Sequence, residues 1–135
     1  MKALCRLLLL GALTAFAWPA LAHHSFAMFD FTKLVTITGT VKEFQWTNPH
    51  VVVWVFVESK DPKNPDVWTL EMTSPGNLTR NGWNRKALNP GDKVVVELNP
   101  LRNGNLGGAL VKVTLSATGQ VFSTDLREME KPGLK

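Results

Sequence analysis

The chain has 135 residues, enough for one domain, with 15 basic residues, 11 acidic residues and a single cysteine. The basic residues form no cluster, so charge gives no reason to expect nucleic-acid binding. A single cysteine excludes an intramolecular disulfide, and packing alone must hold the fold.

Residues 1–22 have the pattern of a cleavable secretion signal. Lys2 and Arg6 supply the positive start, and the apolar run that follows is too short to span a bilayer comfortably. The string Ala20-Leu21-Ala22 is typical of a cleavage site, which disfavours the alternative of an uncleaved anchor. We therefore predict export to the periplasm and a mature chain that begins at His23. Its net charge falls from +4 to +2 with the loss of the two basic residues, and no stable membrane anchor remains.

Alternating apolar residues predict the first two strands of the mature domain. Residues 34–46 alternate with one phase at first and with the opposite phase from Phe44 onward. Because a period of two cannot shift by one without an inserted residue, we expect a β-bulge near Lys42-Glu43. Thr47-Asn48-Pro49-His50 is a turn sequence. Val51–Val57 is apolar on both faces, which predicts a strand covered on both sides.

The second half of the domain is predicted to hold one short helix between strands. Ser74-Pro75 favours a helix start, with the serine as N-cap and the proline at the first helical position. Gly82 is a typical stop, so the helix is expected over residues 75–81. Alternation predicts the remaining strands at residues 68–72, 93–98 and 111–115.

The order of elements, three strands, a short helix and two strands, resembles the OB-fold, a five-stranded Greek-key barrel. We therefore predict an all-β, small five-stranded OB-like Greek-key barrel over residues 34–124. An N-terminal extension at 23–33 precedes it and a flexible tail at 125–135 follows it. An open β-sandwich is the alternative, although closing the sheet removes its edges and suits a small domain without disulfides.

The histidines are the candidate metal ligands. Once cleavage frees its amino group, His23 can chelate a metal through the amine and a ring nitrogen, and His24 adds a second imidazole; such ligands suit copper(II). Met28 offers a thioether for copper(I), and residues 23–33, which span up to ~35 Å when extended, are long enough for the N-terminus to fold back toward His50. The alternative is that two histidines after a cleavage site bind nothing. The sequence shows no carboxylate that evidently pairs with these histidines.

The tryptophans suggest a second kind of site. Packing in the core and at the barrel rim is the favoured interpretation for most of them, which are Trp46, Trp54, Trp68 and Trp83. OB barrels also stack ligands on aromatic side chains. Trp83 follows the helix stop and is the tryptophan expected to be most exposed, with Arg80 and Arg102 as charged neighbours in a ligand-binding face. Together with Glu71 and Arg85 these arginines are otherwise solvated surface charge.

No catalytic motif is present: the sequence has no G-x-S-x-G, no H-E-x-x-H and no glycine-rich phosphate loop before a helix. We therefore expect a non-enzymatic binding protein, with copper or a similar metal at the histidines. The alternative is a module that binds a small ligand, an oligosaccharide or a protein partner through an aromatic barrel face. A metalloenzyme would need an open coordination position and a substrate cleft.

Several short strings occur together in the chain: His23-His24-Ser25-Phe26, Trp46-Thr47-Asn48-Pro49-His50, Arg80-Asn81-Gly82-Trp83 and Pro90-Gly91-Asp92. In combination they resemble a family of small exported bacterial proteins that is classed as a domain of unknown function. The resemblance covers essentially the whole mature chain. It implies a periplasmic β-barrel-like domain, and it carries over no activity, substrate or catalytic residue.

Overall fold

The structure, a computed structural model, describes residues 26–61 and 63–124. The predicted signal at 1–22, the two histidines His23 and His24 and the predicted tail at 125–135 lie outside the described residues. The elements are η1 (Phe26–Met28), β1 (Val35–Gln45), β2 (Val52–Val57), β3 (Asp66–Glu71), α2 (Pro75–Arg80), β4 (Lys93–Pro100), β5 (Gly107–Leu115) and β6 (Val121–Ser123).

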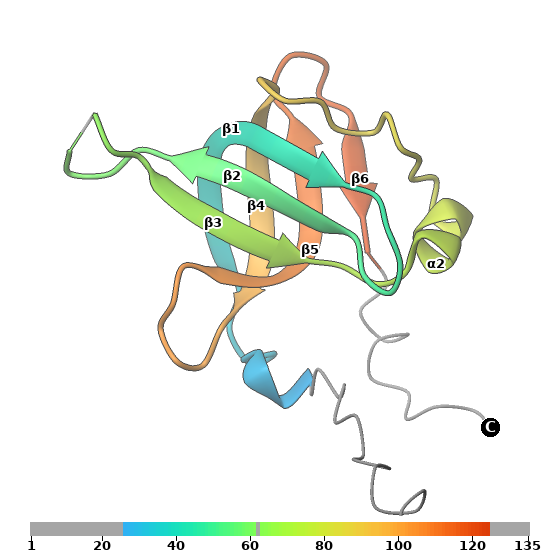
Figure 1. Cartoon of the computed structure of the whole chain (residues 1–135), viewed down its shortest axis with the longest axis horizontal. Coiled ribbons are helices and arrows are strands. Elements are labelled where there is room, and N and C mark those ends of the chain that lie inside the picture. Colours follow the sequence, from blue (N-terminus) through green and yellow to red (C-terminus); the bar gives the residue numbers. More distant parts are fainter. Residues whose placement is uncertain (1–25, 62, 125–135) are drawn as a thin grey trace, which may run out of the picture.

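The strands form one sheet that closes on itself. Their order is β3-β2-β1-β4-β5-β6, with antiparallel neighbours, and a short parallel pairing of β3 with β5 closes the five-stranded barrel. Strand β1 curves across the barrel and pairs with β2 on one side and β4 on the other (Figure 1). The structure therefore confirms the predicted five-stranded OB-like barrel with one short helix between β3 and β4.

A β-bulge lies in β1 where the sequence predicts one. Val41 pairs with Val55 and Glu43 pairs with Trp54, so Lys42 is the extra residue. The insertion restores the inward phase, and Phe44 packs against the core. The predicted phase change is therefore confirmed.

The barrel interior is filled by alternate residues of every long strand and by residues around α2. The largest of the side chains that are less than 2% exposed are Trp83, Leu70, Met72, Leu78, Leu98, Leu110, Val41, Val51, Val53, Val55, Val94 and Val96. The alternation of Val111, Val113 and Leu115 predicts all three as core residues of the last strand, and this prediction is wrong for Val111. A second bulge between Glu97 and Leu98 in the β4–β5 pairing skips Val111, which is half-buried, and Leu110 lies in the core in its place.

Helix α2 begins and ends close to the predicted residues. The Ser74 hydroxyl accepts a hydrogen bond from the backbone N–H of Asn77, and Pro75 occupies the first turn. The helix ends at Arg80, and Gly82 has a φ of +83°, a left-handed conformation that favours glycine. Leu78 is the residue that the helix buries in the core.

The short strand β6 is not among the predicted strands. It pairs antiparallel with β5, and its central residue, Phe122, is buried against the Trp83 ring with 5.0 Å between centroids. The strand has only three residues, which is too short for an alternating pattern to identify it.

Candidate functional site

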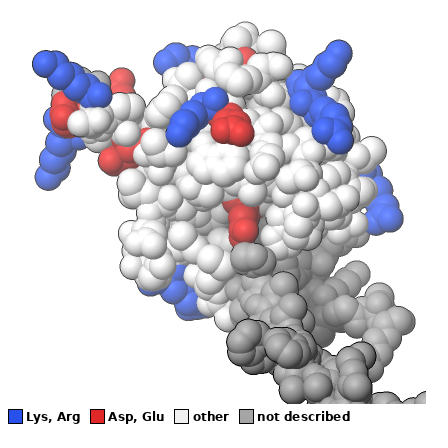
Figure 2. Space-filling view, in the orientation of Figure 1, with Lys and Arg blue, Asp and Glu red and all other residues white. Residues whose placement is uncertain are grey.

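The outer face of β2 is apolar and only partly covered. Val53 and Val55 point inward and are fully buried, whereas Val52, Trp54 and Phe56 point outward and are half-buried. The prediction that both faces of this strand are covered is therefore wrong for the outer face. Most of the surface over β2 and β3 in Figure 2 is white, and charged side chains gather at the β2–β3 hairpin loop at the left.

The described part of the N-terminal extension forms a wall beside this face. Phe29 pairs with Leu101 in an isolated β-bridge and is buried. The Arg102 backbone N–H donates to the carbonyl of Met28 at 2.9 Å, and its Nε–H donates to the carbonyl of Ala27 at 3.0 Å. Residues 27–29 are therefore held against the loop that joins β4 to β5.

Asp30 fixes the extension on the side nearer to β1. Its backbone N–H donates to the Pro100 carbonyl at 2.8 Å, and its carboxylate accepts from the Thr32 hydroxyl at 2.6 Å. Lys33 Nζ lies 3.1 Å from the same carboxylate. The Thr32 hydroxyl, followed by Lys33, lowers the pKa of Asp30 from 3.8 to about 2. The carboxylate is therefore ionised throughout the neutral range.

A hollow of about 210 Å³ lies between the extension and the outer face of β2 and β3. Trp54 and Val52 of β2 and Thr69 of β3 line one side, and Met28 lines the other. Glu71, at the end of β3, is the one charged side chain among the described lining residues. The hollow therefore combines apolar walls with a single carboxylate.

His50 lies beside this carboxylate. Its Nδ1 is 3.7 Å from Glu71 Oε1, and each side chain is 22% exposed. The sequence shows no evident carboxylate partner for the histidines, and the structure corrects this expectation by pairing Glu71 with His50. The β2–β3 register places Glu71 opposite Val52, two residues after His50, so assuming a hairpin between these strands would have identified the pair.

Of the four predicted metal ligands, the structure describes two. Met28 lines the hollow and is 40% exposed, and Glu71, which lines the same hollow, contacts His50. His23 and His24 lie outside the described residues. Within residues 26–61 and 63–124, no group of three or more His, Cys, Asp or Glu side chains is arranged to hold a metal ion.

Trp83 is not the exposed aromatic residue that the sequence predicts. It is 1% exposed, its Nε1–H donates to the Ser123 carbonyl at 2.8 Å, and its ring lies between Phe122 and Phe44. The chain turns at Gly82 toward the barrel, so the residue after the helix stop points inward. The tryptophan that lines a hollow is Trp54.

The other tryptophans follow the core interpretation: Trp46 and Trp68 pack against the buried cluster. Trp54 was not singled out from the sequence. Trp54 lies between Val53 and Val55, which point into the barrel. Because side chains alternate along a strand, Trp54 points outward.

The charged residues considered as one site make separate contacts. Arg80 Nη1 donates to the side chain of Asn77, and Arg85 Nη1 donates to the carbonyl of Trp46. Arg102 contacts the extension, and Glu71 contacts His50. The predicted grouping of Trp83, Arg80 and Arg102 in one ligand-binding face therefore has no counterpart among these contacts.

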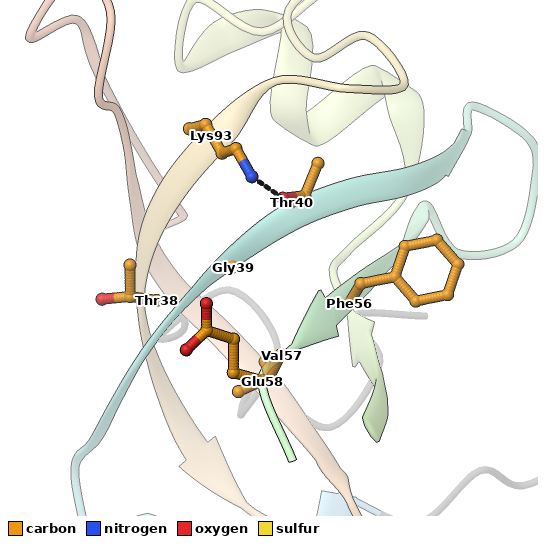
Figure 3. A pocket seen from close by; sticks show the side chains of 7 residues that line it. All are labelled: Thr38, Gly39, Thr40, Phe56, Val57, Glu58 and Lys93. Carbon is orange, nitrogen blue, oxygen red and sulfur yellow. Dashed lines mark hydrogen bonds between the residues drawn. The ribbon is translucent and has the colours of Figure 1, made fainter. Parts of the chain in front are cut away.

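A second hollow, of about 250 Å³, lies over the middle of β1 (Figure 3). Lys93 Nζ donates to the Thr40 hydroxyl at 2.7 Å, and the Glu58 carboxylate lies on the other side of Gly39. Phe56, also on its border, has Lys42 over its ring at 5.6 Å. This hollow therefore carries both charge signs.

The described residues contain no helix that is long and apolar enough to cross a membrane.

Comparison with known proteins identifies the family. Residues 12–111 match a family of unknown function, DUF6152, and the chain belongs to this family. A search of curated proteins and a search of solved structures each found no match.

Proposed function

We propose that this chain is a periplasmic metal-binding protein whose mature N-terminal histidines hold copper together with His50. The observation that carries the proposal is the docking of the extension: Met28 lines the hollow that Glu71 also lines, and Glu71 contacts His50. Met28 and His50 thus each lie near Glu71, which supports a site formed by His50 and the residues that precede Met28 in the sequence.

Chain length supports this geometry. His24 precedes Met28 by four residues and His23 by five, which extended chain spans in at most about 14 Å and 18 Å. The second half of the extension is docked through Phe29 and Asp30, so only the residues before Met28 have to approach His50. The full ~35 Å span of residues 23–33 is not required for this.

The donor set suits copper. A free His23 amine and ring, the His24 ring and the His50 ring supply nitrogen ligands of the kind that copper(II) prefers. Since Nδ1 of His50 faces Glu71, Nε2 is the ring nitrogen for the metal, and the carboxylate beside the other nitrogen orients the ring. The Met28 thioether adds a soft ligand for copper(I).

The test is calorimetric titration of copper(II) into two forms of the protein, one beginning at His23 and one with an initiator Met before it. For the first form we expect a dissociation constant below about 1 μM, a value that corresponds to a binding free energy of about −8 kcal/mol. For the second form we expect at least tenfold weaker binding. Equal affinity in both forms would remove the amine from the site. Binding weaker than micromolar in the His23 form would overturn the copper function.

A matched pair of variants tests the role of His50. His50→Gln should weaken copper binding severalfold, whereas Thr47→Ala, an exposed change in the same turn, should leave it unchanged. Glu71→Gln should weaken it less than His50→Gln, because the carboxylate acts through the ring. Full affinity in His50→Gln would exclude this histidine as a ligand.

One observation favours a second function, the binding of a small ligand on the outer barrel face. Trp54 lines the hollow with its side chain half-exposed. This residue takes the role that the sequence analysis gave to Trp83.

A further inference from the structure

The hollow between the extension and β2 has the composition of a small-molecule site. Its described lining is apolar on both sides, with Trp54 on the β2 side and Met28 on the extension side, and Glu71 at the edge. We propose that it binds a small organic cation, with the ammonium group at Glu71 and the apolar body against Trp54. The proposal concerns the described residues alone and does not depend on copper.

Charge supports a cationic ligand. Glu71 is the one charged residue in the described lining, and its side chain is only 22% exposed. A carboxylate with little solvent around it attracts a cation more strongly than one in water. His50 Nδ1, 3.7 Å from Glu71 Oε1, adds no negative charge to the site, so Glu71 is its one source of negative charge among the described lining residues.

The aromatic wall supports the same class of ligand. The face of an indole ring attracts ammonium groups and also packs against apolar groups. Trp54 pairs with Thr69 across the β2–β3 ladder, and Val52 pairs with Glu71. These are neighbouring pairs on the same face of the sheet. An ammonium at the carboxylate therefore leaves its carbon body along the Trp54 ring.

The volume limits the size of the ligand. At about 210 Å³ the hollow is larger than a 150 Å³ cavity that admits benzene, and smaller than the 300–1,000 Å³ typical of sites for drug-sized molecules. A monoamine with one ring or a short alkyl chain fits this range, whereas an oligosaccharide exceeds it.

The second hollow shows what such a site requires. There Lys93 and Glu58 place both charge signs on the border, and no tryptophan lines it (Figure 3). A cation would meet the Lys93 ammonium in that hollow, so selectivity for amines is expected at Glu71 and not at Glu58.

The test is calorimetric titration, with EDTA present, of three compounds of similar size: 2-phenylethylamine, 2-phenylethanol and 3-phenylpropionate. At pH 7 the amine should bind at least tenfold more tightly than the alcohol, and the acid should bind least. Equal binding of all three, or no binding of the amine, would overturn the proposal.

Variants assign the site. Glu71→Gln should remove the preference for the amine over the alcohol, and the matched variant Glu58→Gln in the second hollow should keep it. A variant at Trp54 should weaken the binding of both the amine and the alcohol. If Trp54→Leu fails to fold, Trp54→Phe, which retains an aromatic ring, replaces it in this measurement. An unchanged preference in Glu71→Gln would place the amine elsewhere. EDTA removes copper from this titration, so a failure of the amine to bind leaves the copper proposal standing. A failure of copper to bind in the other titration likewise leaves the amine proposal standing.

Discussion

The two faces of β2 differ in burial, although apolar residues occupy both. The inward side chains, Val53 and Val55, are fully buried in the barrel, whereas the outward side chains, including Trp54, are half-buried beside a docked segment. The inner face belongs to a closed core packed at high density. The outer face is covered at one end by residues 27–29, which leaves a hollow next to them. Residue type therefore does not determine which face packs the fold and which face is available to a ligand.

The largest effect is expected from the inner face. Leu70→Ala removes a side chain that is 0% exposed and should lower the free energy of unfolding by about 2–5 kcal/mol. Its neighbour Thr69 is exposed on the outer face, so Thr69→Ala should change the free energy by no more than about 0.5 kcal/mol. Urea unfolding of both variants measures the difference. Similar losses would contradict the assignment of the two faces.

A smaller effect is expected where β1 pairs with β2 beside the second hollow. A Cβ added at Gly39 would lie 2.2 Å from the Phe56 carbonyl oxygen and 2.7 Å from Val55 Cγ1, so Gly39→Ala should destabilise the fold by about 1–3 kcal/mol. Gly76, in α2, has nothing within 4 Å of an added Cβ. Gly76→Ala should therefore be neutral or stabilising by up to about 1 kcal/mol in the same unfolding measurement, and a loss as large as that of Gly39→Ala would contradict the steric explanation.

The smallest effect concerns the wall of the hollow. The pKa of Asp30 is lowered to about 2, so its ionised form stabilises the folded state fully above pH 3.8 and this contribution is lost as the pH falls through about 2. Asp30→Asn should therefore lower Tm at pH 7 and leave Tm nearly unchanged at pH 2. Thermal unfolding at both values checks this expectation, with Asp92→Asn in the half-buried turn before β4 as a comparison. An equal loss of Tm at both values would exclude the carboxylate as the cause.

Much of the fold could be predicted because its signals are local. The phase change before Phe44 specified the bulge in β1, and Ser74-Pro75 specified the start of α2. The second bulge could not be predicted, because Val111 continues the alternation of β5 and only the pairing with β4 excludes it from the core. The direction of Trp83 was missed for the same reason: its environment is formed by Phe122, which is distant in sequence.

Less of the candidate site could be predicted. Met28 and His50 were identified by their chemistry. Glu71, which lines the same hollow as Met28 and lies beside His50, could be found only from the register of β2 and β3. Trp54 was one aromatic residue in an apolar run, and nothing local distinguished its outward position from an inward one. The positions of sites formed by several segments depend on tertiary pairing, which single-sequence patterns do not contain.

The docking of the extension has a consequence for the order of folding. Residues 27–30 attach to Pro100, the last residue of β4, and to Leu101 and Arg102, which follow it in the chain. A polypeptide that is synthesised or translocated from its N-terminus thus carries its first segment without a docking partner until β4 is complete. A contact between residues this far apart in sequence costs more chain entropy to form than the contacts of a hairpin. The hollow is accordingly among the last surfaces to assemble, and a truncation before residue 100 abolishes it even though most of its lining residues remain.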